Sequence, residues 1–453
     1  MRDFATLTAL LLCFAVPAMA ETVVVSSEDT LRAALDAASQ GEGATSIEIG
    51  GDSDIRISAP LVYAGRAPLE LRGNGQTVLT DQNMTLLHVT EGADLTVSGL
   101  SFRGPGGYAI TARPEGSAGK GIFVDLRDDQ TGEVTVALDG VTVEGVSGHG
   151  IHISDCDHAD DCGDGGSDAS IRVALNAVTV RDVGNGSFDA DGLRVDERGA
   201  GDIWFEATRS LFANIGADGV ELDEGQDGSV IVNVSDTQFN TNGAYCDPAV
   251  LAAFVPSPDE AEFDQGARAE ADIPGPVTGT PDDACIEREV DLHDDGSVEF
   301  YEFGIDVDDG FDVDEAGQGH IIATLNGTSI RENLGQGLDF DEEDAGSIVL
   351  RVEDGVFQSN IDDGIKLSEE DAGDVLAILS GVFALSNGGK GAVFEEEDDG
   401  DATVSVLFST TRDNGDGDDT GLEVDEDDAG EGVLMLHQST IADGFDADNV
   451  DLR

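Results

Sequence analysis

The chain of 453 residues has few basic residues and few aromatic residues. Lys and Arg together number 22, against 95 Asp and Glu, which gives a formal net charge of −73. A surface this acidic repels the phosphates of nucleic acid and of anionic membranes, so both classes of partner are excluded. Aromatic residues make up 5% of the chain and Trp204 is its only tryptophan, which leaves few flat platforms for stacking against sugar rings.

Long apolar runs are also missing beyond the first 20 residues. Arg2, the apolar stretch 7–16 and the Ala-Met-Ala sequence at 18–20 have the organisation of a secretory signal peptide cleaved after Ala20. The apolar stretch is too short to span a bilayer, and no later stretch predicts a transmembrane segment. We therefore expect residues 1–20 to be a signal peptide and the mature protein to be secreted, periplasmic or extracellular.

Cysteine is scarce too, and four cysteines remain after the predicted cleavage. Cys156 and Cys162 flank a short acidic loop, and Cys246 and Cys285 bracket a stretch rich in Pro, Asp and Gly. Export favours disulfide formation, which would join each of these pairs. Free thiols are the alternative.

What the chain has in abundance is an acidic phrase whose copies most often lie 27 residues apart. Its copies read like Gly337-Leu-Asp-Phe-Asp-Glu342, and they begin at Gly192, Gly219, Gly310, Gly337, Gly364, Gly391 and Gly421. A fixed period in this range indicates one supersecondary unit stacked on copies of itself. Residues at one phase of the repeat are therefore aligned in space, and here many of them are acids.

One copy, from Gly337 to Asp363, shows what each repeat builds. Leu338 and Phe340 alternate with acids, a second alternating segment covers 348–353, and a short apolar piece follows at 356–357. Alternation with period two predicts strands, and Asp-, Gly- and Asn-rich turns separate them. Two or three short strands in 27 residues leave no room for a helix, so each repeat is one coil of a parallel β-helix.

A second register supports the same coil. Asn333, Asn360 and Asn387 each lie four residues before the glycine of the phrase. Stacked Asn side chains can form hydrogen bonds along the axis of the stack, so we expect them to line an inward-facing turn.

The coil length and the Asp-Gly-aliphatic turns resemble those of the right-handed parallel β-helix, pectate-lyase-like superfamily. Such turns begin at Asp191, Asp218, Asp309 and Asp363. The resemblance implies an all-β, right-handed parallel β-helix solenoid of about 27-residue coils. It implies little about activity, because this fold hosts lyases, hydrolases, epimerases, adhesins and inert spikes.

The chain before and within the repeats predicts three further features. Residues 21–48 form an N-terminal strand and an amphipathic capping helix, with Ser26 and Asp29 as its capping box and Leu31 and Leu35 on its apolar face. The β-helix then occupies residues 49–453. The spacing from Gly219 to Gly310 is far longer than one coil, so we expect an inserted loop at about 245–308.

Stacked acids at the β-strand spacing of about 4.8 Å repel one another, and basic residues are too few to neutralise them. Hard carboxylate oxygens suit Ca²⁺, which we predict to bridge successive acidic turns. The predicted ligands are Asp196, Glu197, Asp223, Glu224, Asp314, Glu315, Asp341, Glu342, Asp344, Glu369, Glu370, Asp371, Glu395, Glu396, Asp398, Asp425, Glu426 and Asp428. A solvated acidic face with diffuse counterions is the alternative.

The residue between the two apolar positions of each phrase is predicted to face outward. This column contains a mixture of bases and acids that could act on a polysaccharide: His152, Arg194, Glu221, Asp312, Asp339 and Lys366. Known catalytic motifs do not support an enzyme, because Asp291-Leu292-His293-Asp294 lacks the proline of the Asp-Pro-His-Asp motif of alginate epimerases.

These features predict an exported β-helix protein with an acidic, Ca²⁺-binding surface and a structural or binding role at or outside the cell envelope. We expect a carbohydrate or cell-surface partner. The alternative is a polysaccharide lyase, hydrolase or epimerase that acts on the outer face of one sheet.

Overall fold

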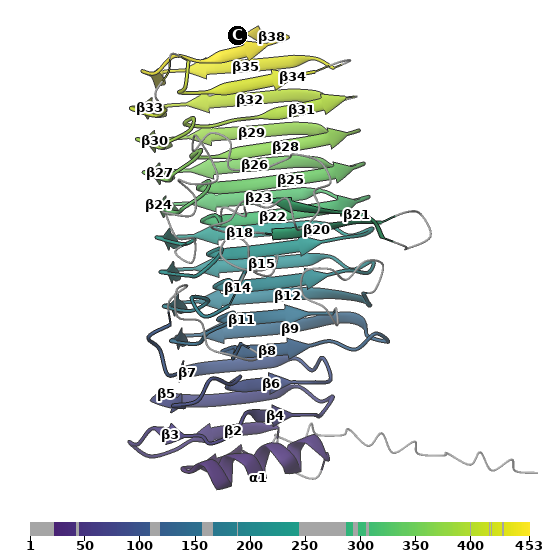
Figure 1. The fold of residues 1–453 in the computed structure, drawn as a ribbon, viewed down its shortest axis with the longest axis vertical. Helices are drawn as coiled ribbons and strands as arrows, with labels where there is room; N and C mark the ends of the chain where they lie inside the picture. Colours follow the sequence, from purple (N-terminus) through teal and green to yellow (C-terminus); the bar gives the residue numbers. More distant parts are fainter. Residues whose placement is uncertain are drawn as a thin grey trace, which may run out of the picture.

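The computed structural model describes residues 22–41, 45–108, 118–155, 166–187, 189–243, 287–292, 298–304, 308–398, 400–415, 417, 419–427 and 430–453, with backbone alone for 287–304 and 398. The predicted signal peptide, all the cysteines and Asp428 lie outside these residues. The described chain forms an all-β parallel β-helix, as predicted from the repeat, with its coils stacked along one axis (Figure 1).

Each regular coil contributes three strands, one to each of three parallel columns. The first column is a 12-stranded sheet. Its strands are β4 (Leu61–Tyr63), β6 (Leu87–Val89), β8 (Ile122–Asp125), β11 (Ile151–Ser154), β14 (Leu193–Glu197), β17 (Val220–Glu224), β22 (Phe311–Gly317), β25 (Leu338–Asp344), β28 (Lys366–Asp371), β31 (Glu395–Asp398), β34 (Glu423–Glu426) and β37 (Asp446–Asp448).

The other two columns belong to one 24-stranded sheet. The longer strands are β1 (Thr22–Val25), β2 (Ser46–Ile49), β5 (Leu69–Leu79), β7 (Leu95–Arg103), β9 (Thr131–Asp139), β12 (Asp168–Asn176), β15 (Ile203–Thr208), β18 (Val230–Ser235), β23 (Ile321–Asn326), β26 (Ser347–Glu353), β29 (Asp374–Ser380), β32 (Asp401–Leu407), β35 (Gly432–His437) and β38 (Val450–Leu452). The short strands are β3 (Ile55–Arg56), β10 (Thr142–Glu144), β13 (Thr179–Arg181), β16 (Leu211–Ala213), β19 (Gln238–Asn240), β24 (Ser329–Arg331), β27 (Val356–Gln358), β30 (Phe383–Leu385), β33 (Thr410–Arg412) and β36 (Thr440–Ile441).

Among the described residues one helix is present, α1 (Glu28–Ser39), and it lies against one end of the stack (Figure 1). Its buried residues are Leu31, Leu35 and Ala38, the apolar face that the sequence predicts. The capping box differs by one residue from the prediction. Ser27 and Thr30 form it, because the hydroxyl of Ser27 accepts from the backbone N–H of Thr30 at 3.3 Å.

The interior of the coils is apolar and closely stacked. Phe340 is fully buried, with Val313 opposite it on the preceding coil and Leu367 on the next, as its alternation predicts. The predicted asparagine ladder is confirmed as well. The Nδ2 of Asn333 donates to the Oδ1 of Asn360 at 2.9 Å, and that of Asn360 donates to the next Asn at 3.1 Å.

The segment predicted as an inserted loop contains an antiparallel hairpin of β20 (Glu287–Leu292) and β21 (Val298–Gly304). The insertion leaves the stack in register, because Glu224 before it pairs with Glu315 after it. The asparagine ladder also continues across it, since the backbone N–H of Asn242 donates to the Oδ1 of Asn333 at 3.1 Å. In the part of the chain that the structure describes, no helix is both long and apolar enough to cross a membrane.

Candidate functional site

The last glutamate of each acidic phrase faces the interior of the β-helix. In β14, Leu193, Val195 and Glu197 are all fully buried, and they alternate along the strand. The same position in each later coil pairs in register with the one below it. We call this column the glutamate ladder, and its members are Glu197, Glu224, Glu315, Glu342, Glu369, Glu396 and Glu426, all at most 2% exposed.

The ladder corrects one prediction. We expected these seven glutamates to lie on an acidic surface, yet all seven side chains are buried. A glycine lies four residues after each one, as Gly346 does after Glu342. A Cβ atom on Gly346 would overlap both the Oε1 of Glu342 and the carbonyl oxygen of Gly319 in the preceding coil. The glycine therefore leaves the space that the buried carboxylate occupies.

Burial makes the ladder glutamates weak acids. Loss of hydration raises the pKa of six members, and repulsion from nearby acids adds to the shift; they are Glu197, Glu224, Glu315, Glu342, Glu369 and Glu426. For Glu342, burial raises the pKa to about 8, with Glu369 and Asp344 adding to the shift. The pKa is raised to about 10 for Glu197, about 8 for Glu224, about 9 for Glu315 and about 7 for Glu369.

The other predicted ligands lie on the outer side of the same sheet or in its turns. Asp196, Asp223, Asp314 and Asp341 follow one another in register, and Glu395 pairs with Asp425 further along. Asp196 and Asp223 are buried, and Asp314, Asp341, Glu395 and Asp425 are half-buried. Asp344, Glu370 and Asp371 are exposed in the turns, and the side chain of Asp398 lies outside the described part.

The predicted catalytic residues form one continuous column. His152 pairs with Arg194, and the pairing continues through Glu221, Asp312, Asp339 and Lys366. Their predicted exposure is wrong for the four that are at least nine-tenths buried: His152, Arg194, Glu221 and Asp339. Turn residues contact two of them: Asp189 lies 3.0 Å from Arg194, and the side-chain amide of Gln336 donates to the Oδ2 of Asp339 at 3.0 Å. Asp312 and Lys366 are half-buried.

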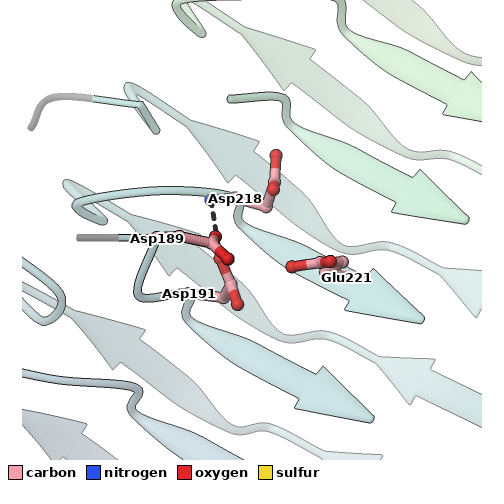
Figure 2. Close-up of side chains that lie close together, drawn as sticks. All are labelled: Asp189, Asp191, Asp218 and Glu221. Carbon is pink, nitrogen blue, oxygen red and sulfur yellow. Dashed lines mark hydrogen bonds between the residues drawn. The ribbon is translucent and has the colours of Figure 1, made fainter. Parts of the chain in front are cut away.

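Arg194 contacts acids from its own strand, from the preceding turn and from the next coil. Its guanidinium contacts Asp196 at 2.7 Å, Glu221 at 2.7 Å and Asp189 at 3.0 Å. Figure 2 shows Asp189 and Glu221 with two further acids, Asp191 and Asp218, and one oxygen from each of the four lies within 4.8 Å of the others. One guanidinium thus contacts several carboxylates at once.

Three of these acids were not among the residues predicted for a site. Asp189, Asp191 and Asp218 lie in turns, and Asp218 donates its backbone N–H to the Oδ1 of Asp191 at 3.0 Å (Figure 2). Asp191 and Asp218 belong to the Asp-Gly-aliphatic turns, which served as evidence for the fold alone. The recurrence of an acid directly before the phrase glycine was the signal that could have placed them in the site.

Two histidines, His149 and His152, lie at the N-terminal end of this column. The Nε2 of His152 donates to the Oδ2 of Asp196 at 2.6 Å, and the Nδ1 of His149 lies 3.2 Å from the Oδ2 of Asp191. The pKa of His152 is lowered to about 3. Burial is the largest cause and the adjacent Lys120 the next, and Asp196 opposes both. Burial acts to raise the pKa of Asp196, but Arg194 and His152 reverse this and leave it below its ordinary value.

A second acidic group follows on the next coil. Glu221, Asp312 and Asp314 each place one carboxylate oxygen within 4.8 Å of the others. Burial raises the pKa of Asp312 well above its ordinary value, and the repulsion of Asp314 and Asp218 adds to the shift. We call these three residues the outer acid triad, and their oxygens are the donor type that Ca²⁺ prefers.

No family model and no curated protein sequence matches the chain. Among solved structures, it is similar to the A-module of the mannuronan C-5 epimerase AlgE6 of Azotobacter vinelandii, with 9% identity and a TM-score of 0.37 over 94% of each chain. It is also similar to the periplasmic alginate epimerase AlgG, with 9% identity and a TM-score of 0.34 over 83% of this chain and 77% of that one. The catalytic domain of a GH87 α-1,3-glucanase gives 9% identity and a TM-score of 0.36, over 98% of this chain and 69% of that one. At these values the similarity transfers no activity to this chain.

Proposed function

We propose that this chain is an exported β-helix protein that binds Ca²⁺ through carboxylates on the outer side of its 12-stranded sheet. Its role is structural or in binding, at or outside the cell envelope, with a carbohydrate or another cell-surface molecule as partner. The outer acid triad carries the proposal, because Glu221, Asp312 and Asp314 bring three carboxylate oxygens within 4.8 Å of one another. Export rests on the predicted signal peptide.

Electrostatics favours a cation at this position. Two unit charges about 4.8 Å apart repel by roughly 3.5 kcal/mol at an effective dielectric constant of 20. Arg194 neutralises Glu221 in part, at 2.7 Å, but the neighbours that act most strongly on Asp312 are acids. Ca²⁺ accepts six to eight oxygen ligands in flexible geometry, so it can use the triad together with water and nearby acids.

Calcium binding tests the proposal directly. We expect isothermal titration of the divalent-free protein to show Ca²⁺ binding that the pair of changes Asp312→Asn and Asp314→Asn weakens at least tenfold at one site. Asp168→Asn, an exposed acid on the opposite sheet, should leave binding unchanged. If NaCl at matched ionic strength raised the melting temperature as much as Ca²⁺ does, diffuse counterions would account for the charge instead.

The polysaccharide-active alternative has one observation in its favour, the continuous column of bases and acids from His152 to Lys366. Its buried members do not suit a substrate, because Arg194 and His152 are at most 3% exposed and are engaged with carboxylates. Incubation with alginate or polygalacturonate separates the two functions. We expect no cleavage and no epimerisation.

A further inference from the structure

The glutamate ladder has a spacing that matches one kind of ion. Adjacent members belong to parallel strands paired in register, such as Glu315 with Glu342 and Glu342 with Glu369. Paired strands lie about 4.8 Å apart, so carboxylates held at this spacing would place an ion midway between them about 2.4 Å from each. Ca²⁺–oxygen distances are about 2.3–2.6 Å, whereas Mg²⁺ requires about 2.0–2.1 Å.

Three central members of the ladder, Glu315, Glu342 and Glu369, are buried without an N–H donor in the part of the chain that the structure describes. Among the described residues no N–H or hydroxyl group donates to either side-chain oxygen of Glu315, Glu342 or Glu369, and these carboxyl groups interact with one another along the ladder instead. These three side chains are at most 1% exposed, so bulk water does not solvate them either. A buried carboxylate in this state is costly unless a counter-charge or another ligand reaches it.

Backbone oxygens complete the same narrow space. A Cβ atom on Gly373 would overlap the Oε1 of Glu369 and the carbonyl oxygen of Gly346. The carboxylate of one coil and the glycine carbonyl of the coil before it therefore border one position. Gly346 and Gly400 show the same arrangement on the adjacent coils. Carboxylate and carbonyl oxygens together are the donor set of protein Ca²⁺ sites.

We propose that the glutamate ladder binds Ca²⁺ inside the β-helix, in the gaps between successive ladder carboxylates. This site goes beyond the outer acid triad, since it lies on the interior side of the sheet and uses different residues. One Ca²⁺ balances two glutamates, so ions in every second gap leave the ladder almost neutral. The central gaps, on either side of Glu342, have the strongest claim because no N–H or hydroxyl group of the described residues donates to their carboxylates.

The test compares two adjacent glutamates that differ in direction. Glu342 points inward and is fully buried, whereas Glu343 on the same strand is exposed. Full-length wild type, Glu342→Gln and Glu343→Gln would be dialysed against Ca²⁺, and bound metal counted by atomic absorption. We expect Glu342→Gln to lose at least one Ca²⁺ per chain and Glu343→Gln to lose none. An unchanged count in a folded Glu342→Gln protein would overturn the proposal.

Infrared difference spectroscopy of the wild type covers the case in which Glu342→Gln does not fold. At pH 6, Ca²⁺ entering the ladder must displace protons from its carboxyl groups, so the band of protonated carboxylic acid should decrease on Ca²⁺ addition. A band that saturating Ca²⁺ leaves unchanged would show that the ladder holds protons and no calcium. Loss of the outer site in the Asp312→Asn and Asp314→Asn protein should leave this spectral change intact, so the two proposals can fail separately.

Discussion

Without divalent cations, the protein should become less stable as pH rises from 5 to 7. Burial raises the pKa of Glu342 to about 8, whereas an ordinary Glu has a pKa of 4.5. Between these values the folded chain holds a proton that the unfolded chain has released. Stability therefore falls with rising pH by about 1.4 kcal/mol per pH unit for each such group. This dependence ends once the pH exceeds the raised pKa, because both states are then ionised.

Five members of the ladder have a raised pKa of about 7 or more. If they titrated independently, the slope would reach about 7 kcal/mol per pH unit, which over two units rivals the whole stability of a domain. Coupling between neighbouring acids makes this an upper limit, and even a third of it is easily measured. His152 opposes the trend, since its pKa is lowered to about 3, but it contributes about 1.4 kcal/mol per unit at most.

Urea unfolding followed by circular dichroism, at pH 5, 6 and 7 with EDTA and constant ionic strength, measures this slope. We expect the midpoint to fall steadily toward pH 7, and Glu342→Gln to reduce the slope by about one proton. Saturating Ca²⁺ should flatten the curve. Below about pH 4 the trend should reverse, because Asp196 has a lowered pKa and loses its ion pairs when protonated. A midpoint that rises or stays level from pH 5 to 7 in EDTA would refute the assignment of raised pKa values to the ladder.

Three further predictions concern the core and the sheet. Phe340→Ala should destabilise by about 3–5 kcal/mol in urea unfolding, and Phe340→Leu by much less, because the side chain fills the interior of its coil. Equal losses of stability in the two variants would mean that the size of the side chain at this position does not determine the cost. Asn360→Ala should cost about 2–5 kcal/mol, since Asn333 loses the acceptor for both its backbone and side-chain N–H groups; Asn326→Ala, an exposed asparagine, should cost less than 1 kcal/mol. Lys366→Ala should lower the thermal stability slightly, because Lys366 lies 3.7 Å from Asp339, and a gain in stability would show that this pair is unimportant.

The fold could be predicted because the same pattern of apolar, acidic and asparagine positions recurs in successive coils. Period-two alternation around Phe340 places that residue inside, and a fixed phase aligns Asn333 with Asn360. The strand positions predicted for one coil are supported by the same pattern in the next coil. A local error, such as the one-residue shift of the helix capping box, therefore does not change the predicted fold.

The direction of the ladder glutamates was harder to predict. Alternation along β25 places Glu342 on the same side as Leu338 and Phe340, but the cost of burying a carboxylate argues for the surface. The glycine four residues later was the missing clue, because it creates the space for the side chain. Burial of the outer column could not be predicted from the strands, since it depends on turns such as the one that contains Asp189.

The unbroken register across the insertion has a consequence for the size of the protein. Asn242 and Asn333 are 91 residues apart, and Asn333 and Asn360 are 27 residues apart. In both pairs the backbone N–H of the first asparagine donates to the Oδ1 of the second. Stacking of two coils thus requires that their strands and asparagines pair in register. The number of residues that connect the two coils can vary. A whole coil could be duplicated or deleted by recombination without disturbing the rest. Each such event would add or remove one glutamate of the ladder, so ion capacity would scale with copy number.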